Sequence, residues 1–434
     1  MPKSIAIVGG GISGLVTAYD LERLTDCEID LYEATDRLGG KIQTSRIGEF
    51  LVEEGPDCFF SRKPGVNEFV SEIGLDDDVI RPIQKEFMML IGGNLHRIPG
   101  GLVTLTYSKP DAIDEATFLS PEAKSRVMKE AEQPMGTGAD ESIRSFFNRR
   151  FGREFTSLVV EPLLAGTHGG DPNCLSMAAL YPGYFNLERQ HGSLSAGMPT
   201  PAAGSETSKP SFLSFRGGMQ TLVDRVAKKL ERTRVHLGTA TDFEQLSNDF
   251  VVLAIPAANA SNLIGKRMPE AGRALQRIPH RSSAIVTLAY DRDQIGHALD
   301  GTGFLVPPDE PCRVSGATWS SQKWEGRAPE GSVLMRVFMK SGLDADDDTL
   351  AMSGLAEIAS LLDIKGEPKL KMVTRWTNAL PQYEVGHLDR ISAIEAELAA
   401  TPNIILTGTS FRGVGIPDCI SQGRKAAKTI AERL

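Results

Sequence analysis

Paired cysteines and long apolar runs are both missing from this sequence of 434 residues. It holds five cysteines, an odd and widely spaced set without a CxxC pair: Cys27, Cys58, Cys174, Cys312 and Cys419. This excludes a disulfide framework and a cysteine-rich metal site, and it favours a reducing compartment. No apolar run approaches the roughly 18 residues that cross a bilayer, and the strand-like start at Ile5 leaves no room for a signal peptide. The predicted location is the cytoplasm, or a membrane face as a peripheral protein.

A surplus of basic side chains is also lacking. The 47 Lys and Arg are outnumbered by 56 Asp and Glu, which gives a formal net charge of -9. Broad affinity for nucleic acid depends on neutralising phosphates with cationic side chains, so we expect no nucleic-acid partner. The seven histidines show no paired spacing that would suit a metal ion, and we expect no metal site. The length exceeds what one hydrophobic core of about 250 to 300 residues supports, which predicts two or three domains.

The N-terminal segment predicts a strand, a turn, a helix and a second strand. Ile5–Val8 and Ile29–Tyr32 are apolar runs typical of parallel strands buried on both faces, and apolar residues recur at helical spacing between them. The turn GGGISG, at Gly9–Gly14, matches the pattern GxGxxG, and Glu33 follows nineteen positions later. In that pattern the glycines allow a tight turn and backbone approach to a pyrophosphate, while the carboxylate binds ribose hydroxyls. We therefore predict a dinucleotide site; the alternative is a purely structural glycine turn.

Further glycine-rich segments indicate which dinucleotide is bound. A second turn, RLGGK, spans 37–41, and EEGPDC follows at 53–58. Near the C-terminus, GTSFRGVGIPDCI at 408–420 combines the end of a buried strand, close backbone turns and a helix start, whose dipole would stabilise negative charge on a ligand. Together these segments resemble the superfamily of flavin-dependent amine oxidases, phytoene desaturases and porphyrinogen oxidases. The resemblance implies FAD as the cofactor.

The resemblance assigns cofactor binding to residues from all of these segments. They are Gly9, Gly10, Gly11, Ile12, Ser13, Gly14, Glu33, Ala34, Arg37, Gly40, Lys41, Gly55, Pro56, Asp57, Cys58, Thr241, Val414, Gly415 and Ile416. Thr241 is a departure, because the family usually offers a valine to the adenosine at this position. The stretch between 237 and 250 is also short, as if a hairpin of the family were missing.

Several stretches narrow the resemblance to the protoporphyrinogen and coproporphyrinogen oxidases of haem biosynthesis. They are GVGIPDCI followed by SQGRKAA at 413–427, EPLLAGTHGGDP at 161–172 and WSSQKWEGRAP at 319–329, so the resemblance spans nearly the whole chain. It implies FAD-dependent oxidation of a porphyrinogen to the porphyrin, six electrons in three flavin cycles, with oxygen as acceptor. The flavin carries the chemistry, and we assign no catalytic side chain. Protoporphyrinogen IX and coproporphyrinogen III both stay open as the substrate.

Five residues are candidates for contact with this substrate, whose edge carries carboxylates. Lys85, His96 and Arg97 offer cationic donors, and Gly166 and His168 lie in the segment that resembles the family's porphyrinogen pocket. Each of these residues has an alternative role without contact to the substrate. Lysine and arginine side chains mostly lie in solvent, and a histidine in a loop mostly forms a hydrogen bond with a neighbouring residue. An arginine that some family members use to bind a propionate is missing, since QKEF occupies 84–87.

The predicted fold is α/β, or α+β overall, in three parts. Residues 1–84, 212–258 and 404–434 form a Rossmann-type FAD-binding domain with a parallel sheet. Residues 96–211 form a helical insertion, the part of the resembled family that touches membranes, and it ends in a flexible loop at 192–211. Residues 85–95 and 259–403 form a substrate domain with a mixed or antiparallel sheet.

Two other functions fit the same flavin motifs. One is a flavin amine oxidase or polyene desaturase, and the other is a flavin-binding partner protein without turnover. For a porphyrinogen oxidase the partners are the tetrapyrrole substrate and molecular oxygen. Peripheral membrane contact, a homodimer and hand-over of the product to a chelatase are further hypotheses.

Overall fold

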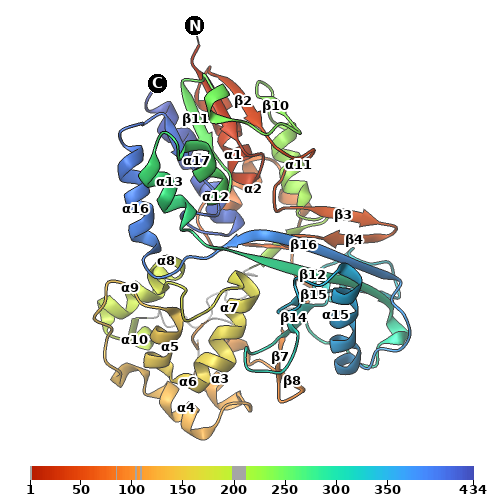
Figure 1. Ribbon diagram of the computed structural model, residues 1–434. Helices are drawn as coiled ribbons and strands as arrows, with labels where there is room; N and C mark the ends of the chain where they lie inside the picture. Colours follow the sequence, from red (N-terminus) through yellow and green to blue (C-terminus); the bar gives the residue numbers. More distant parts are fainter. Residues whose placement is uncertain (1, 85, 103–104, 108–109, 198–211) are drawn as a thin grey trace. The chain divides into compact units, whose positions relative to one another are not determined.

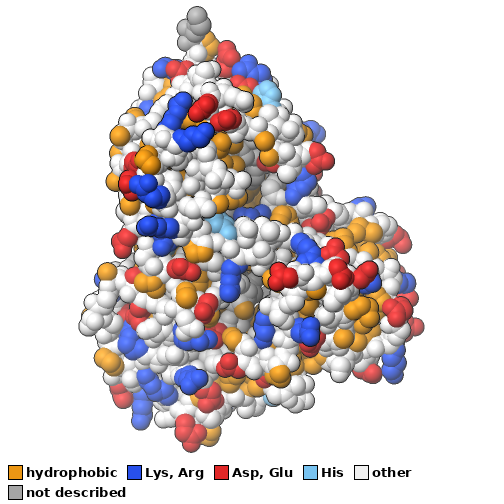
Figure 2. Space-filling model, viewed as in Figure 1, with side chains coloured by type: hydrophobic (Ala, Val, Ile, Leu, Met, Phe, Trp, Pro, Cys, Tyr) orange, Lys and Arg blue, Asp and Glu red, His pale blue; other side chains and the backbone are white. Residues whose placement is uncertain are grey.

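The computed structural model describes residues 2–84, 86–102, 105–107, 110–197 and 212–434. The chain forms two compact units, each built from a sheet and helices (Figure 1). Unit 1 consists of residues 1–81, 210–279 and 387–434, and unit 2 of residues 82–209 and 280–386. Acidic and basic side chains are mixed over the face shown in Figure 2 rather than separated by sign. The predicted mixed α/β class is confirmed.

Unit 1 is built on a five-stranded parallel sheet in the order β10-β2-β1-β11-β17. Its strands are β1 (Ser4–Val8), β2 (Glu28–Tyr32), β10 (Arg234–His236), β11 (Phe250–Leu253) and β17 (Ile404–Leu406). Strand β1 pairs in parallel with β2 on one side and with β11 on the other, so the strand order reverses at β1. In an open α/β sheet, a ligand binds at such a switch point, beyond the carboxyl ends of the strands.

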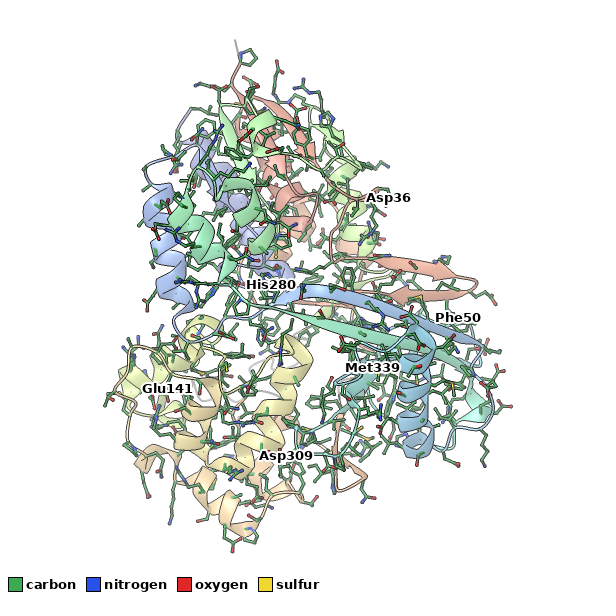
Figure 3. All side chains as sticks on the ribbon, viewed as in Figure 1. Asp36, Phe50, Glu141, His280, Asp309 and Met339 are labelled. Carbon is green, nitrogen blue, oxygen red and sulfur yellow. The ribbon has the colours of Figure 1, made fainter. Side chains whose placement is uncertain are left out.

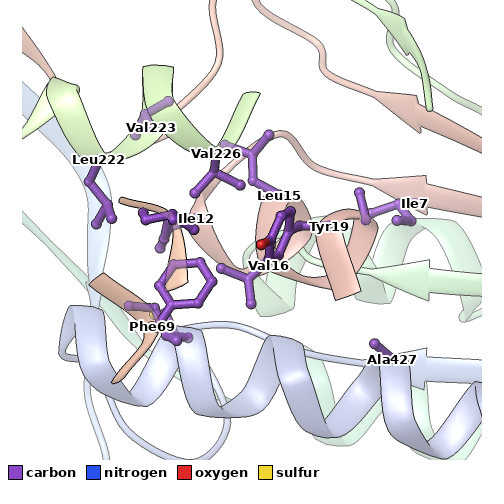
Figure 4. Close-up of a cluster of buried hydrophobic side chains, with 14 of the residues drawn as sticks. Ile7, Ile12, Leu15, Val16, Tyr19, Phe69, Leu222, Val223, Val226 and Ala427 are labelled. Atoms are coloured by element: carbon purple, nitrogen blue, oxygen red, sulfur yellow. The ribbon is translucent and has the colours of Figure 1, made fainter. Parts of the chain in front are cut away.

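Four helices cover one face of this sheet. They are α1 (Ile12–Leu24), α2 (Val66–Glu72), α11 (Gln220–Lys228) and α17 (Ile416–Ala431). Their apolar side chains form one core with the strands, which includes Ile7, Leu15, Phe69, Val226 and Ala427 (Figure 4). Two small sheets complete unit 1: β3 (Thr44–Ile47) with β4 (Phe50–Glu53), and β9 (Phe212–Phe215) with β5 (Phe59–Phe60) and β6 (Val79–Ile80).

Three helices cover the opposite face of the parallel sheet. They are α12 (Ala257–Ile264), α13 (Pro269–Gln276) and α16 (His387–Leu398). Their apolar side chains pack with Ala6, Val8 and Leu253 of the strands. This packing places 259–279 and 387–403 in unit 1, whereas the sequence assigned both ranges to the substrate domain. The difference arises because an apolar helix face does not reveal which sheet it covers.

Unit 2 contains a seven-stranded sheet in the order β16-β12-β15-β14-β13-β7-β8. Its strands are β7 (Met88–Ile91), β8 (Asn94–Arg97), β12 (His280–Asp291), β13 (Gly303–Leu305), β14 (Val314–Thr318), β15 (Ser332–Met339) and β16 (Leu370–Pro381). The described pairings are antiparallel except that of β13 with β7, which confirms the predicted mixed sheet. Two helices accompany it, α14 (Ser320–Lys323) and α15 (Asp347–Leu362).

Unit 2 also has a helical part within residues 111–197. Its helices are α3 (Asp111–Glu115), α4 (Pro121–Met128), α5 (Ile143–Phe151), α6 (Arg153–Phe155), α7 (Glu161–His168), α8 (Met177–Leu180), α9 (Pro182–His191) and α10 (Leu194–Gly197). They share a core rich in phenylalanine, which includes Phe146, Phe151 and Phe155. The predicted flexible loop at 192–211 is wrong at its start, because Leu194 is fully buried and begins α10. Residues 198–211 of that loop lie outside the described residues.

Candidate functional site

Two of the three glycines that the GxGxxG pattern requires are needed for the protein's own packing. Gly9 has a φ of +111°, and a Cβ there would lie 2.5 Å from the Ala254 carbonyl oxygen. A Cβ at Gly14 would overlap the Gly9 carbonyl oxygen. At Gly11, by contrast, no described atom lies within 4 Å of the Cβ position, and its φ of -70° is accessible to any residue. The space beside Gly11 is therefore open, as the close approach of a ligand requires.

Helix α1 begins at this open turn, and its N-terminus suits an anion. Gly11 is the N-cap, no side chain caps the helix, and its first turn contains no acidic residue. The first amides of a helix lack intrahelical acceptors, and the helix dipole places partial positive charge at this end. Backbone groups arranged in this way bind the phosphates of a nucleotide.

Glu33 follows β2 and is held firmly beside the first turn. Its Oε2 accepts a hydrogen bond from the Gly10 N–H at 2.8 Å. Its Oε1 accepts from the Thr35 N–H at 2.9 Å and from the Thr35 hydroxyl at 2.8 Å. These bonds orient the carboxylate but leave acceptor capacity, since an ionised carboxylate has about four lone-pair sites. The remaining capacity suits ribose hydroxyls, and Thr35 is a contributor that the sequence prediction missed.

The second glycine turn packs directly on the first. The Gly39 N–H donates to the Gly10 carbonyl oxygen at 2.9 Å, and Gly39 forms an isolated parallel bridge with Gly11. Arg37 shapes this second turn, because its guanidinium donates to the carbonyl oxygens of Leu38, of Gly40 at 2.5 Å, and of Ile42 just after the turn. These contacts fix the backbone of the second turn, and the direct contact of Arg37 with the cofactor stays a prediction.

Lys41 connects the second turn to the C-terminal segment. Its ammonium donates to the Thr409 hydroxyl at 3.2 Å, and burial lowers its pKa. Cys419 is buried nearby, and burial raises the pKa of its thiol to about 11, so this thiol stays neutral at pH 7. A Cβ at Gly55 would overlap the Lys41 carbonyl oxygen. The structure thus brings the predicted residues Lys41 and Gly55 together with the C-terminal segment.

Helix α17 begins at Ile416, within the segment where the sequence predicted a helix start, with Gly415 as its N-cap and Pro417 in its first turn, where proline is tolerated. The Gly415 N–H donates to Asp418 Oδ2 at 3.0 Å, and Asp418 Oδ1 pairs with Lys63. The sequence predicted that this helix N-terminus stabilises negative charge on the flavin. In the structure the ion pair of Asp418 with Lys63 lies at the same helix end. Neither Lys63 nor Asp418 was predicted, although an acidic residue three positions after an N-cap is a capping signal that identifies Asp418.

Thr241 provides an independent indication of a ligand. It follows β10, in the segment whose Thr239 N–H donates to the Glu33 carbonyl oxygen at 2.9 Å. Its Oγ1 is buried and has no hydrogen-bond partner within the part of the chain that the structure describes, and such an unmet group costs about 1–3 kcal/mol. Together with the open space at Gly11, this hydroxyl fits a bound dinucleotide. The pyrophosphate would lie at Gly11, and the adenosine would lie at Glu33 and Thr241.

Replacing Thr241 with valine should weaken FAD binding. The change removes one hydrogen bond of about 0.5–1.5 kcal/mol, which corresponds to a dissociation constant about two- to twelvefold higher. Thr241→Ser keeps the hydroxyl and should stay within about twofold of the wild type. Titration of apoprotein with FAD, followed by flavin fluorescence, measures the three constants. Equal constants for all three proteins would show that the hydroxyl does not face the cofactor.

The predicted substrate residues all belong to unit 2, and Lys85 lies outside the described residues. His96 and Arg97 lie on the edge strand β8, where His96 is half-buried. The Arg97 guanidinium pairs with Glu86 and Asp300, and 55% of the Arg97 side chain is exposed. Part of its charge is therefore already neutralised within the protein.

Gly166 and His168 lie together in the last turn of α7. A Cβ at Gly166 would lie 3.3 Å from the Leu305 side chain. The His168 Nε2 is 3.1 Å from the Tyr181 hydroxyl, and burial raises the pKa of Tyr181 well above its usual range, so the phenol stays neutral. The Tyr181 hydroxyl is therefore a local hydrogen-bond partner of His168, as expected if His168 has a structural role.

Two further features bear on the site. Within the described ranges, no three His, Cys, Asp or Glu side chains are grouped so that they could hold a metal ion. None of the helices that the structure describes combines the length and the apolar character needed to span a membrane.

Known proteins similar to this chain are flavoenzymes and porphyrinogen oxidases. A family model described as flavin containing amine oxidoreductase matches residues 12–431. Coproporphyrinogen III oxidase of Bacillus subtilis (strain 168) is 32% identical, over 98% of this chain and 97% of its own. Protoporphyrinogen oxidase of Schizosaccharomyces pombe (strain 972 / ATCC 24843) is 28% identical, over 99% of this chain and 98% of its own. A solved structure from Exiguobacterium sp. 255-15 is 31% identical, with a TM-score of 0.85 and 100% coverage of both chains.

Proposed function

The chain belongs to the family of flavin-containing amine oxidoreductases, and we propose that it oxidises coproporphyrinogen III to coproporphyrin III in haem biosynthesis. It is an FAD-dependent oxidoreductase. The observation that carries the substrate proposal is the nearly full-length similarity to the coproporphyrinogen III oxidase of Bacillus subtilis. The open space at Gly11 and the unmet hydroxyl of Thr241 support it, because they suit the cofactor that such an enzyme needs.

In this proposal the residues of unit 1 bind and orient FAD. Bound FAD supplies a two-electron acceptor, so the six electrons of a porphyrinogen require three cycles, with oxygen as the final oxidant. Gly11 and the N-terminus of α1 hold the pyrophosphate, and Glu33 fixes the ribose. Lys41 holds the C-terminal segment 408–420 through its hydrogen bond to the Thr409 hydroxyl. Its positive charge favours an anionic group nearby.

Protoporphyrinogen IX is the second candidate substrate, because the similar protein of Schizosaccharomyces pombe is named protoporphyrinogen oxidase. The two substrates differ at two edge positions, which carry propionates in coproporphyrinogen and vinyl groups in protoporphyrinogen. Recognition of the extra carboxylates needs cationic donors. We propose Lys85, His96 and Arg97 for this role, with Gly166 and His168 beside the macrocycle.

Steady-state assays with the two porphyrinogens test the proposed function. Porphyrin fluorescence is followed in air after the protein is mixed with each substrate, and a Gly11→Ala variant controls for spontaneous oxidation. We expect enzyme-dependent porphyrin formation, with kcat/KM about tenfold higher for coproporphyrinogen, as one charge-assisted contact of roughly 1.4 kcal/mol would give. Turnover of amines or polyenes without turnover of either porphyrinogen would contradict the proposal.

Arg97→Ala should raise KM for coproporphyrinogen about tenfold and leave kcat nearly unchanged, because a contact made equally in the ground and transition states affects KM alone. A guanidinium has five N–H donors, so Arg97 can reach a propionate while it pairs with Glu86 and Asp300. Arg153→Ala, at an exposed arginine of the same unit, is the matched control. An unchanged KM for both porphyrinogens would remove Arg97 from the site.

Location and assembly belong to the same proposal. A porphyrin is a large apolar macrocycle, so release at a membrane face or directly to a chelatase would keep it from aggregating. We propose a cytoplasmic homodimer with peripheral membrane contact. Sedimentation with lipid vesicles tests the membrane contact, and analytical ultracentrifugation tests the dimer. A monomer that stays in the supernatant would contradict both points.

A further inference from the structure

Strand β10 lies at one edge of the parallel sheet of unit 1, beside β2 (Figure 1). Three residue pairs join the two strands in register, from Arg234 with Asp30 to His236 with Tyr32. So short an edge strand gains few backbone hydrogen bonds from its neighbour, and its outer side has no strand to bond. Contacts between side chains therefore matter more for the position of β10 than they do in the centre of the sheet.

Five side chains gather on one face of β2 and β10, and we call them the edge cluster: Glu28, Asp30, Tyr32, Arg234 and His236. The Arg234 guanidinium donates to both carboxylate oxygens of Asp30 at 2.8 Å and to Glu28 at 3.1 Å. Asp30 is only 8% exposed. Hydrogen bonds from Arg234 and His236 lower the pKa of Asp30 against the effect of burial, so this carboxylate stays ionised at pH 7.

His236 makes two contacts within the edge cluster. Its Nε2 lies 2.8 Å from Asp30 Oδ1, and since an ionised carboxylate only accepts, this nitrogen carries a proton and donates. Its ring stacks on the ring of Tyr32, with the centroids 4.7 Å apart and the planes 14° from parallel. Burial raises the pKa of Tyr32, so the phenol stays neutral. Two residues of β2 thus fix both the position and the orientation of the His236 side chain.

The backbone at the end of β10 bonds to the segment that carries Glu33. The Glu33 N–H donates to the His236 carbonyl oxygen at 2.9 Å, and the Thr239 N–H donates to the Glu33 carbonyl oxygen at 2.9 Å. The Gly238 N–H donates to the Thr35 carbonyl oxygen at 2.7 Å. The chain that follows His236 therefore runs beside the proposed ribose contact.

Thr241 lies on this same stretch of chain, and its position depends on the two ends of the stretch. Residues 237–240 are exposed, so packing against a core does not hold them. Phe243, at 6% exposed, is the next residue that packs into the core with side chains of α12 and α13. The buried Thr241 hydroxyl, which lacks a hydrogen-bond partner among the described residues, is therefore placed by Phe243 on one side and by His236 on the other.

We propose that His236 is a positioning residue for the adenosine of FAD, and that it holds the end of β10 so that the Thr241 hydroxyl faces the cofactor. Without this anchor the exposed residues 237–240 would gain freedom. Binding of FAD would then have to order them, and the conformational entropy lost in ordering lowers affinity. The inference rests on the placement of the adenosine at Glu33 and Thr241, and it is independent of which substrate the enzyme oxidises.

Binding of ADP and of FMN to the apoprotein tests the two halves of the cofactor site separately. His236→Phe keeps a ring that can stack on Tyr32 but removes the N–H donor. We expect its dissociation constant for ADP to rise about two- to twelvefold, as for loss of the Thr241 hydrogen bond. Its constant for FMN, which lacks the adenosine, should stay within about twofold of the wild type. His236→Gln keeps an N–H donor and should restore the affinity for ADP. Isothermal titration calorimetry measures all of these constants.

Two further variants control for general effects on the sheet. Lys3 pairs with Asp249 at 3.1 Å at the amino ends of the strands, away from the adenosine, and Lys3→Ala should bind ADP as the wild type does. The double variant of His236→Phe with Thr241→Val tests the route of the effect. If His236 acts through Thr241, the double variant should bind ADP no more weakly than Thr241→Val alone, because effects on one shared contact do not add.

Four results would overturn the role of His236. They are wild-type affinity for ADP in His236→Phe, an equal loss of ADP and FMN affinity in that variant, no recovery in His236→Gln, and independent effects that multiply in the double variant. Wild-type affinity for ADP in Thr241→Val would instead contradict the placement of the adenosine, and the proposed role of His236 would fail with it. None of these measurements involves a porphyrinogen, so their failure is distinguishable from a failure of the proposed function.

Discussion

Gly11→Ala is expected to lose FAD while it keeps its fold. No described atom lies within 4 Å of the Cβ position at Gly11, so the added methyl group meets no neighbour in the protein. It does occupy the space through which the pyrophosphate would approach the backbone. Losing two charge-assisted hydrogen bonds of about 1.5 kcal/mol each raises the dissociation constant of FAD about 100-fold. Titration of apoprotein measures this constant, and the melting temperature of the apoprotein should match that of the wild type.

Two other glycines serve as controls for this prediction. Gly183, in α9, likewise has nothing within 4 Å of its Cβ position, and Gly183→Ala should leave FAD affinity unchanged. Gly9→Ala should lower the melting temperature, because its φ is +111° and its Cβ would crowd the Ala254 carbonyl oxygen. A Gly11→Ala protein that binds FAD as tightly as the wild type would contradict the placement of the pyrophosphate.

Arg150→Met is expected to lower the free energy of unfolding by about 3–5 kcal/mol, the usual cost of removing one partner from a buried ion pair. Arg150 and Glu130 are both fully buried, and the Arg150 Nε donates to Glu130 Oε1 at 2.6 Å. Glu130 also accepts from the hydroxyls of Ser193 and Ser195, at 2.7 and 2.6 Å. The substitution leaves a buried carboxylate without its cation, in the centre of the helical part of unit 2.

The Glu130 carboxylate also makes the stability of the protein depend on pH in the acidic range. Burial alone would raise the pKa of Glu130, but hydrogen bonds from Ser195, Leu194, Ser193 and Arg150 hold this pKa below the usual 4.5. A carboxyl group whose folded pKa is lowered stabilises the protein above the unfolded value and loses that contribution as the pH falls through the folded value. The wild type should therefore lose stability below pH 4.5, and this part of the loss should be smaller in Arg150→Met.

Urea denaturation followed by circular dichroism measures both effects. Arg153→Met, at an exposed arginine of α6, should change the free energy of unfolding by no more than about 0.5 kcal/mol. The neighbouring pair of Arg149 with Glu141 is partly exposed and should matter less than the buried pair; Figure 3 labels Glu141. An Arg150→Met protein as stable as the wild type would show that apolar packing replaces the pair.

The N-terminal strands and turn could be predicted from the sequence because their signals are local. The apolar runs located β1 and β2 to within one residue, and the glycine pattern located the start of α1. The acidic residue after β2 was also correctly placed, since Glu33 lies beside the first turn. The helix start predicted within 408–420 is likewise local, since Gly415 is the N-cap of α17 and the proline in its first turn is compatible with a helix start.

Contacts between distant segments could not be predicted in the same way. Lys63 and Asp418 are 355 positions apart, and only the packing of the chain brings them together. The hydrogen bonds of the Arg37 guanidinium to carbonyl oxygens of its own turn also depend on the folded backbone geometry, which the sequence pattern does not specify. The assignment of 387–403 to unit 1 depends on which sheet face α16 covers, which its sequence pattern does not record.

Anaerobic mixing of the FAD-loaded protein with coproporphyrinogen III tests most directly whether a porphyrinogen reduces this flavoprotein. We predict bleaching of the visible flavin absorption before air is admitted, and porphyrin fluorescence that depends on the protein afterwards. The same measurement with protoporphyrinogen IX ranks the two substrates. If neither porphyrinogen bleaches the flavin of a protein that does hold FAD, the proposed function is contradicted, and amines and polyenes become the substrates to examine.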